Sequence, residues 1–452
     1  MPERELSVAL LEPVERALYD HLMRPDAQED LTFGLYRLAG GTARDTAIVV
    51  DSVLPIDGER YVHGNASFTG AYVERALGTA RARECGLVFL HSHPLGTGWQ
   101  RMSEDDEIAE RRIAAGVLAA TGLPIVGMTL ARDEHYSARR WNRIAPRTYT
   151  RQDAVNVRVI GKRLRVSLPP AREIAFEAFD RTDSVWGSAE RAKLSRLRVA
   201  IVGLGSVGSQ VAEILARIGV RQVVLIDHDR VKVINLDRTL NATTSDEGAY
   251  KVDVAACAMR AHSPCGVNVN AIPARCDDAV AYRALLDCDF TFCCVDRPWG
   301  QRILNHLAYA NAIPVSNGGL LARRRKGRFI GADWHVHVVG PGRRCMQCWN
   351  AFDPGDAALD RDGFLDDPSY VKNMNPDSPL IAHANAIPYA MSVASMQVMQ
   401  FIAIVVGPIN DLGDWNFHAA TGTCDTSGDS GCEDECLYAD ITGDVRSFPP
   451  LR

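Results

Sequence analysis

Short hydrophobic runs alternate with amphipathic segments over the first 150 residues. The 3.6-residue spacing of apolar positions predicts helices at 70–83 and 103–119, and acids among the apolar positions of 1–22 indicate an amphipathic helix rather than an export signal. Runs rich in β-branched and aromatic residues predict strands at 31–38, 47–54, 86–91 and 124–131. We therefore expect an α+β domain over 1–150.

The order of predicted strands and helices changes at Leu197. A strand at 198–202 runs into a glycine-rich turn and a helix, and further apolar strands end at Asp227 and span 289–295. Alternating strands and helices favour a mainly parallel, Rossmann-like sheet, so we assign 197–452 to a second domain of an α/β protein. Residues 151–196 contain a strand-like stretch and Pro169-Pro170, and we interpret them as a linker and docking segment.

Composition narrows the function classes. The formal net charge of −6 gives no electrostatic footprint for nucleic acid. We expect no membrane association, because the apolar stretches look shorter than the ~20 residues that span a bilayer; the methionine-rich stretch 386–404 is expected to be a core or dimer-face helix. Without an export signal, a cytoplasmic location with mostly reduced cysteines is expected.

A cluster of metal-binding residue types lies between residues 91 and 106. His91 and His93 are two apart, so on a strand both imidazoles point the same way, and Asp106 falls in the first turn of the following helix. Two histidines and one carboxylate leave a fourth zinc position for water, which is the catalytic pattern. The Ser103-x-x-Asp106 motif is also a plain helix capping box, and that reading stays open.

The combination of His-x-His-Pro and Ser-x-x-Asp resembles the JAMM (JAB/MPN) metalloprotease family, which removes ubiquitin-like proteins or trims their C-termini. The resemblance covers about 1–150 and implies that His91, His93 and Asp106 bind a catalytic zinc. It also implies that Ser103 stabilises the oxyanion. Glu29 is the best match for the family's general base, with Glu59 as an alternative.

A second constellation begins at Gly203-Leu-Gly205-Ser-Val-Gly208, between a strand and a helix. Such a turn lets backbone approach a phosphate, but a dinucleotide-binding dehydrogenase would carry it too. The residues that follow decide between the two readings. An enzyme in which a carboxylate attacks the α-phosphate of ATP needs cationic groups to offset the repulsion of two anions. Candidates for this site are Asp227, Asp229, Asn235, Arg238, Lys251 and Asp296.

This spacing resembles the ubiquitin-activating superfamily, including the ThiF/MoeB-like adenylyltransferases, from about Arg181 to Gly407. The resemblance implies that Asp227 holds the ribose of ATP and that Asp296 holds magnesium. By the same resemblance Asn235, Arg238 and Lys251 hold the phosphates. Arg181 matches an arginine that reaches into the partner's site in family dimers, although a solvated linker charge explains it equally well; a homodimer is expected.

Cys345-x-x-Cys348 matches the first half of a structural zinc site in related adenylyltransferases. The candidates for the second half, Cys432 and Cys436, are one residue too widely spaced, and Cys424 lies nearby. No cysteine occurs between Trp349 and Gly407, where thioester-forming relatives carry their nucleophile. We therefore expect the reaction to stop at the acyl-adenylate or to hand it directly to an outside acceptor.

Together the two resemblances suggest a bacterial-type bifunctional enzyme that processes and adenylates the C-terminal glycine of a ubiquitin-like protein, using zinc, ATP and magnesium. A downstream conjugating enzyme is a possible further partner. The alternative is activation and trimming of a sulfur-carrier β-grasp protein in cofactor or secondary-metabolite biosynthesis. A non-catalytic scaffold and an NAD-dependent oxidoreductase explain fewer of the residues.

Overall fold

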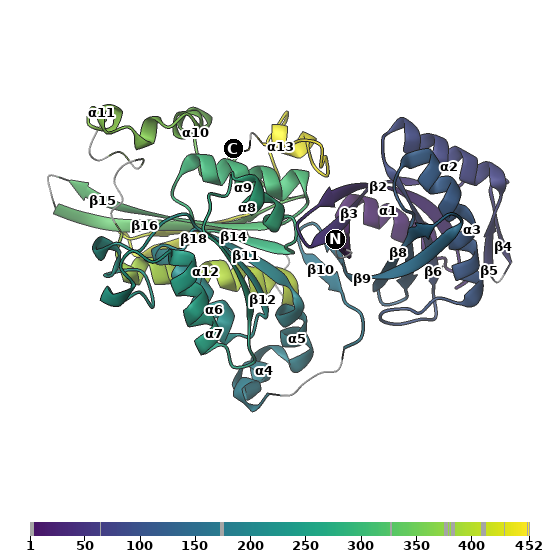
Figure 1. The fold of residues 1–452 in the computed structure, drawn as a ribbon, viewed down its shortest axis with the longest axis horizontal. Coiled ribbons are helices and arrows are strands. Elements are labelled where there is room, and N and C mark those ends of the chain that lie inside the picture. Colours follow the sequence, from purple (N-terminus) through teal and green to yellow (C-terminus); the bar gives the residue numbers. More distant parts are fainter. Residues whose placement is uncertain are drawn as a thin grey trace. The chain divides into compact units, whose positions relative to one another are not determined.

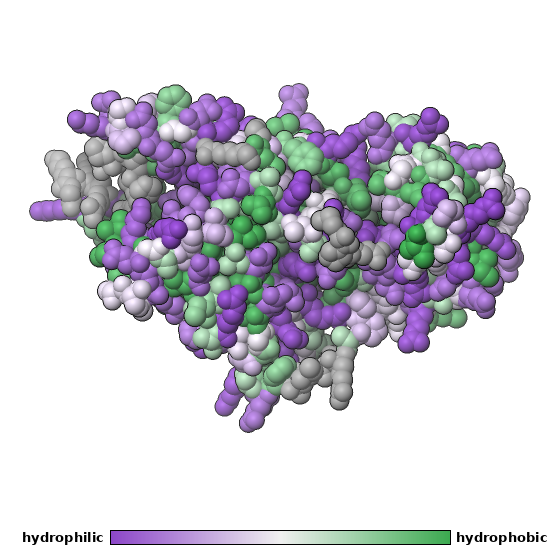
Figure 2. All heavy atoms as spheres, in the orientation of Figure 1, coloured by the Kyte–Doolittle hydropathy of each residue, from purple (hydrophilic) through white to green (hydrophobic). Residues whose placement is uncertain are grey.

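The computed structural model describes residues 4–63, 65–171, 176–325, 328–374, 378, 380, 385–407, 413–428, 430–449 and 451. The chain forms two compact units (Figure 1). Unit 1 comprises 1–172 together with 443–445, and unit 2 comprises 173–442 together with 446–452. On the face shown in Figure 2, hydrophilic side chains are interspersed with small apolar patches.

Unit 1 is built on a closed sheet. Because β1 pairs in parallel with both β3 and β9, the sheet closes on itself. Strand β10 pairs antiparallel with residues 157–160 of β9. The order is β1-β3-β2-β6-β7-β8-β9-β10. The strands are β1 (Glu5–Leu11), β2 (Leu31–Gly40), β3 (Arg44–Val53), β6 (Gly86–His93), β7 (Val126–Ala131), β8 (Tyr136–Ala145), β9 (Thr148–Ile160) and β10 (Leu164–Ser167).

Two apolar cores stabilise unit 1. One packs α1 (Glu12–Leu22) against the sheet through Leu18 and Leu22. The other lies under α2 (Gly70–Ala82) and α3 (Glu104–Thr121) and contains the edge-to-face rings of Phe33 and Tyr72. A separate hairpin is formed by β4 (Arg60–His63) and β5 (Asn65–Phe68).

Unit 1 contains three strands that the sequence analysis did not predict, β4, β5 and β8, and it differs from the expectation at two further segments. Residues 5–11 form β1 instead of the first half of a helix, because this run is buried on both sides between β3 and β9. Residues 148–160 and 164–167 are strands of the unit 1 sheet, so the expected linker segment of 151–196 begins inside this unit. Pairing with β1, about 150 positions earlier in the chain, holds β9 there.

Unit 2 is an α/β sheet of the order β13-β12-β11-β14-β15-β16-β17-β18. The first five of these strands are parallel, and the pairs from β15 onward are antiparallel. The strands are β11 (Arg198–Val202), β12 (Gln222–Ile226), β13 (Asn268–Ile272), β14 (Phe290–Cys293), β15 (Val315–Arg325), β16 (Arg328–Val339), β17 (Asp414–His418) and β18 (Thr423–Ser427).

Helices cover both faces of this sheet (Figure 1). The order reverses at β11, and open α/β sheets bind ligands in the crevice at such a switch point. The helices are α4 (Asp180–Trp186), α5 (Ser188–Arg196), α6 (Ser206–Arg217), α7 (Lys251–His262), α8 (Ala279–Leu285), α9 (Pro298–Ala310), α10 (Pro354–Arg361), α11 (Pro368–Val371), α12 (Ile387–Val406) and α13 (Leu437–Asp440).

Helix α12 is the one helix among the described residues that is long and apolar enough to cross a membrane. The expectation of only shorter apolar stretches was wrong here, since the helix has 20 residues. It packs on the sheet: 56% of its most apolar window is buried, and Gln397 donates hydrogen bonds to the carbonyls of Cys293 and Ser316. Its apolar surface is that of a helix covering a sheet.

We predict that Phe33→Ala destabilises unit 1 by about 3–5 kcal/mol, because it removes a fully buried ring from the core under α2 and α3. Hydrogen exchange of peptides from β2 and β6 measures the loss. Ile144→Ala, at a side chain that is 66% exposed, is the matched control and should change these rates little. Equal exchange in both variants would contradict the assignment of this core.

Candidate functional sites

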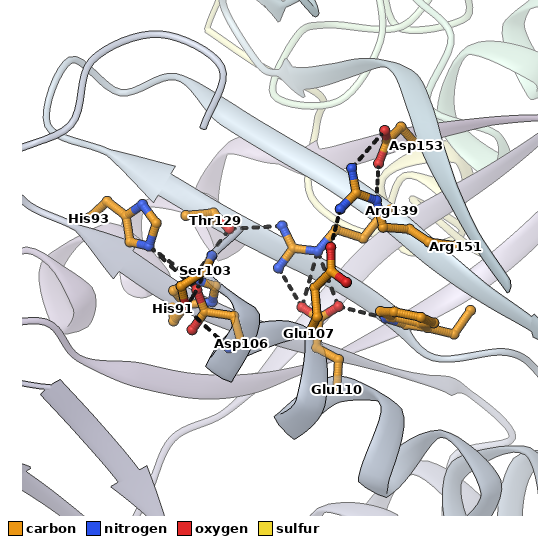
Figure 3. Close-up of polar contacts among 11 residues, drawn as sticks. His91, His93, Ser103, Asp106, Glu107, Glu110, Thr129, Arg139, Arg151 and Asp153 are labelled. Atoms are coloured by element: carbon orange, nitrogen blue, oxygen red, sulfur yellow. Dashed lines mark hydrogen bonds and ion pairs between the residues drawn. The ribbon is translucent and has the colours of Figure 1, made fainter. Parts of the chain in front are cut away.

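The end of β6 and the start of α3 bring three metal-binding side chains together in unit 1 (Figure 3). His91 Nε2 lies 3.2 Å from His93 Nε2 and 3.5 Å from Asp106 Oδ2, and the third side of this triangle is 3.8 Å. Tetrahedral zinc with bonds of about 2.0–2.1 Å separates its ligand atoms by about 3.3–3.4 Å. The three atoms therefore fit around one zinc ion.

Contacts within this triangle shift the pKa values of two of its members, His93 and Asp106. Hydrogen bonding to Asp106 raises the pKa of His93 above its usual value, against the effect of burial. Burial alone would raise the pKa of the Asp106 carboxyl, but contacts with the two imidazoles and Ser103 bring it well below its usual range. Asp106 is thus an anion, the form that binds a metal.

Ser103 takes part in a capping box. Its hydroxyl accepts from the Asp106 backbone N–H at 3.2 Å and donates to Asp106 Oδ2 at 2.8 Å. The structure therefore contains the helix cap that the Ser-x-x-Asp pattern indicates. The same contact places the Ser103 hydroxyl beside Asp106 Oδ2, a candidate metal ligand. Helix capping and the expected stabilisation of an oxyanion by Ser103 are therefore compatible.

The two candidate bases have different surroundings. Glu29 precedes β2 and is near enough to raise the pKa of His93 through its charge. Glu59 is buried and paired with Arg75, whose Nη2 lies 2.5 Å from its Oε2. An acid held by an arginine has its pKa lowered, as for Glu59, and is a poor base. The surroundings favour Glu29.

In unit 2 the glycine-rich turn joins β11 to α6. Gly203 has a positive φ of 89°, and a Cβ there would lie 2.7 Å from the Cys294 carbonyl oxygen. A Cβ on Gly208 would lie 1.8 Å from the Gly203 carbonyl, whereas a Cβ on Gly205 would meet nothing within 4 Å. The first and third glycines thus serve close packing, and the open space at Gly205 suits an approaching phosphate.

Two acids follow β12, the buried Asp227 and the half-exposed Asp229. Asp227 accepts from the backbone N–H of Leu204 at 2.6 Å and of Asp229 at 2.8 Å, and burial raises its pKa. Lys251, at the start of α7, is only 9% exposed and donates to Asp229 Oδ2 at 2.7 Å. Burial opposes ionisation of Asp229, but the Lys251 ammonium lowers its pKa overall. Lys251 is therefore a buried cation close to the glycine-rich turn.

The remaining predicted residues are placed by local contacts of their own or lie exposed. Arg238 is held by the Ile234 carbonyl at 2.6 Å and by Asp237, and Asn235 accepts from the Lys232 backbone. Asp296 is exposed and lies three residues after the end of β14. Between them, the carbonyl of Cys294 packs against Gly203 of the glycine-rich turn. Arg181 is exposed on α4.

The structure brings the four cysteines together despite the wide spacing of the second pair. The Sγ atoms of Cys345 and Cys348 each lie 3.7 Å from that of Cys436, and Cys432 completes the group. Zinc–sulfur bonds of about 2.3 Å in a tetrahedron separate the sulfurs by about 3.8 Å. The group fits a structural zinc, and Cys424 lies outside it, exposed on β18.

Several residues at the unit 1 site were missed by the sequence analysis. Gln100 Oε1 lies 3.3 Å from His93 Nδ1 and can fix the tautomer that leaves Nε2 free. Glu110, Thr129 and Arg139 form a buried network behind His91. One signal was readable: the buried positions of α3 are Glu110, Ala114 and Val117, so a carboxylate lies within an apolar helical stripe.

Comparison with known proteins identifies the family of the second unit. The model of the ThiF family matches residues 179–426, more than half of the chain, and the chain belongs to this family. It is 28% identical over 160 residues to the SAMP-activating enzyme E1 of Haloferax volcanii, covering 35% of this chain and 57% of that protein. Over 177 residues it is 28% identical to molybdopterin-synthase adenylyltransferase of Escherichia coli, covering 39% and 65%.

The chain thus spans less than two thirds of the length of these relatives. A crystal structure of E. coli MccB with ATP aligns with a TM-score of 0.46 at 17% identity, covering 58% of this chain and 75% of that one. The family match begins at residue 179, so the metallopeptidase resemblance of unit 1 rests on its own residues.

We predict two separable zinc sites. The double variant Cys345→Ser/Cys436→Ser should lose one zinc ion per chain and His93→Ala should lose another, because no residue is shared between the groups. Elemental analysis of the purified full chain measures the content, expected as two ions in the unaltered protein. Retention of both ions in either variant would contradict that site.

Proposed function

We propose that unit 2 adenylates the C-terminal carboxylate of a ubiquitin-like or sulfur-carrier protein. The observation that carries this proposal is Lys251, a buried cation beside the two acids that follow β12, next to a turn with open space at Gly205. Membership of the ThiF family supports it, as do the names of the relatives, which describe activation and adenylyl transfer.

The chemistry requires two anions to meet. A carboxylate attacks the α-phosphate of ATP, and pyrophosphate leaves. Lys251 and Arg238 supply fixed positive charge that offsets this repulsion, and the glycine-rich turn offers backbone N–H groups to the phosphates. Asp227 would hold the ribose, with Asn235 on the phosphates. Asp229 and Asp296 are suited to magnesium, which would neutralise phosphate charge.

The positions of the cysteines bear on which class of carrier protein unit 2 acts on. Since no cysteine lies between Trp349 and Gly407, a thioester at the usual position is not available. This observation favours the second candidate, in which a persulfide attacks the adenylate on a sulfur carrier. Mass measurement of a thiocarboxylate on the carrier separates the two candidates. In either case we propose a homodimer in which Arg181 reaches the partner's site.

We further propose that unit 1 is a zinc peptidase acting on the same kind of tail. His91, His93 and Asp106 would hold the ion, and a zinc ion held there would supply a Lewis acid for the scissile carbonyl and for an attacking water. Glu29 would take the proton from that water, and the Ser103 hydroxyl, turning from Asp106, would donate to the developing oxyanion. The matching distances among the three ligand atoms carry this part of the proposal.

Lys251→Met is expected to weaken binding of magnesium ATP by about 10–100-fold, because a hydrogen bond to a charged group contributes about 1.5–3 kcal/mol. Calorimetric titration of the full chain measures this without the carrier. Lys193→Met removes a surface lysine paired with Glu190 and should leave the affinity unchanged. With a candidate β-grasp carrier, pyrophosphate exchange should fall in parallel; unaltered ATP affinity in Lys251→Met would refute the assignment.

Ser103→Gly should reduce kcat for release of a C-terminal extension from a β-grasp carrier by about 100–1,000-fold, with little change in KM. Glycine is chosen because it replaces serine at a helix N-cap for only a few tenths of a kcal/mol. Ser103→Thr retains the hydroxyl and is the control. A kcat that survives in Ser103→Gly while His93→Ala is inactive would restrict Ser103 to capping.

A further inference from the structure

Behind the candidate zinc ligands, unit 1 buries an ion pair that the proposed chemistry does not use (Figure 3). Glu110 and Arg139 are 0% and 2% exposed. Arg139 Nε lies 3.1 Å from each oxygen of Glu110, and its Nη2 also donates to Oε1. Trp141 Nε1 donates to Oε2 at 2.7 Å. Each carboxylate oxygen therefore has two donor atoms within hydrogen-bond distance, and the single Arg139 Nε hydrogen is shared between them.

The fold leaves room for this pair. Gly127 on β7 lies opposite Arg139 of β8, and a Cβ on Gly127 would lie 2.1 Å from Glu110 Oε1. Such a pair adds little net stability, since desolvation of the charges offsets their attraction. Glu110 lies four residues after Asp106 on α3, so the pair fixes the face of the helix that carries a candidate ligand. Its position points to a role at the site.

Thr129 connects the pair to the site. It lies opposite His91 in the register of β6 and β7, and it is fully buried. Arg139 Nη1 donates to Thr129 Oγ1 at 2.8 Å, and Oγ1 lies 3.4 Å from His91 Nε2. A guanidinium only donates, so the hydroxyl hydrogen of Thr129 is left to point at another acceptor. Among the described residues, that partner is His91 Nε2, the atom facing His93 and Asp106.

We propose that Thr129 is a further donor of the unit 1 reaction centre, hydrogen-bonding an oxygen anion bound there, and that Glu110 and Arg139 position it. This inference rests on the proposed peptidase function. With a metal on the lone pair of His91 Nε2, that atom would no longer accept, and the Thr129 hydroxyl beside it would need another acceptor. A ligand oxygen, such as that of a newly formed C-terminal carboxylate, is then its acceptor.

The test measures anion affinity instead of turnover. The full chain is loaded with Co²⁺, and its visible absorption is followed while acetohydroxamate is added. The spectrum of His93→Ala is subtracted, because this variant keeps the four cysteines and so accounts for any Co²⁺ bound there. Thr129→Val, which keeps the shape and removes the hydroxyl, should weaken acetohydroxamate binding by about 10–100-fold, the effect of one hydrogen bond to a charged acceptor. Thr129→Ser should bind within about threefold of the unaltered chain.

The pair is tested separately. Glu110→Leu/Arg139→Met replaces both charges with apolar groups, which buried pairs tolerate; it should retain the circular dichroism spectrum and show the same loss as Thr129→Val. Unchanged acetohydroxamate affinity in Thr129→Val, with Co²⁺ bound, overturns this inference alone. Absence of any Co²⁺ signal that depends on His93 overturns the peptidase proposal and this inference with it.

Discussion

Both candidate sites depend on one constraint: a buried strand must end close to the start of the next helix, across a loop of three residues in unit 2 and ten in unit 1. In unit 1, β6 ends at His93 and α3 begins at Glu104; in unit 2, β11 ends at Val202 and α6 begins at Ser206. Burial of the strand fixes the backbone on one side, and the helix N-terminus attracts negative charge on the other. This geometry places three side chains that could hold a metal in unit 1 and a glycine with open space around it in unit 2.

Polar contacts between side chains also position the groups of each site. Lys251 is paired with Asp229, and Asp106 Oδ2 lies 3.5 Å from His91 Nε2 and 3.8 Å from His93 Nε2. A buried charge without a partner would be costly, and these contacts lower the pKa of Asp229 and of Asp106. A phosphate at Lys251 or a metal at Asp106 would replace one partner by another.

Local patterns in the chain carried much of the site prediction. The His-x-His pair, the Ser-x-x-Asp motif and the glycine-rich turn each lie within a few residues, where strand and helix periodicity define side-chain directions. The helices α2 and α3 and the strands β2 and β6 were predicted for the same reason. Residues 5–11 were assigned to a helix because a strand buried on both faces shows no alternation of apolar and polar positions.

The sequence by itself determined the kinds of chemistry: which residues can bind metal and phosphate, and on which strand ends they lie. Only the tertiary structure decided which distant groups join them. The closure of β1 onto β9, the meeting of Cys345 and Cys348 with Cys432 and Cys436, and the link from Glu110 through Arg139 to Thr129 all join separate elements. Their contacts follow from sheet pairing and burial of the whole unit, which no local periodicity encodes.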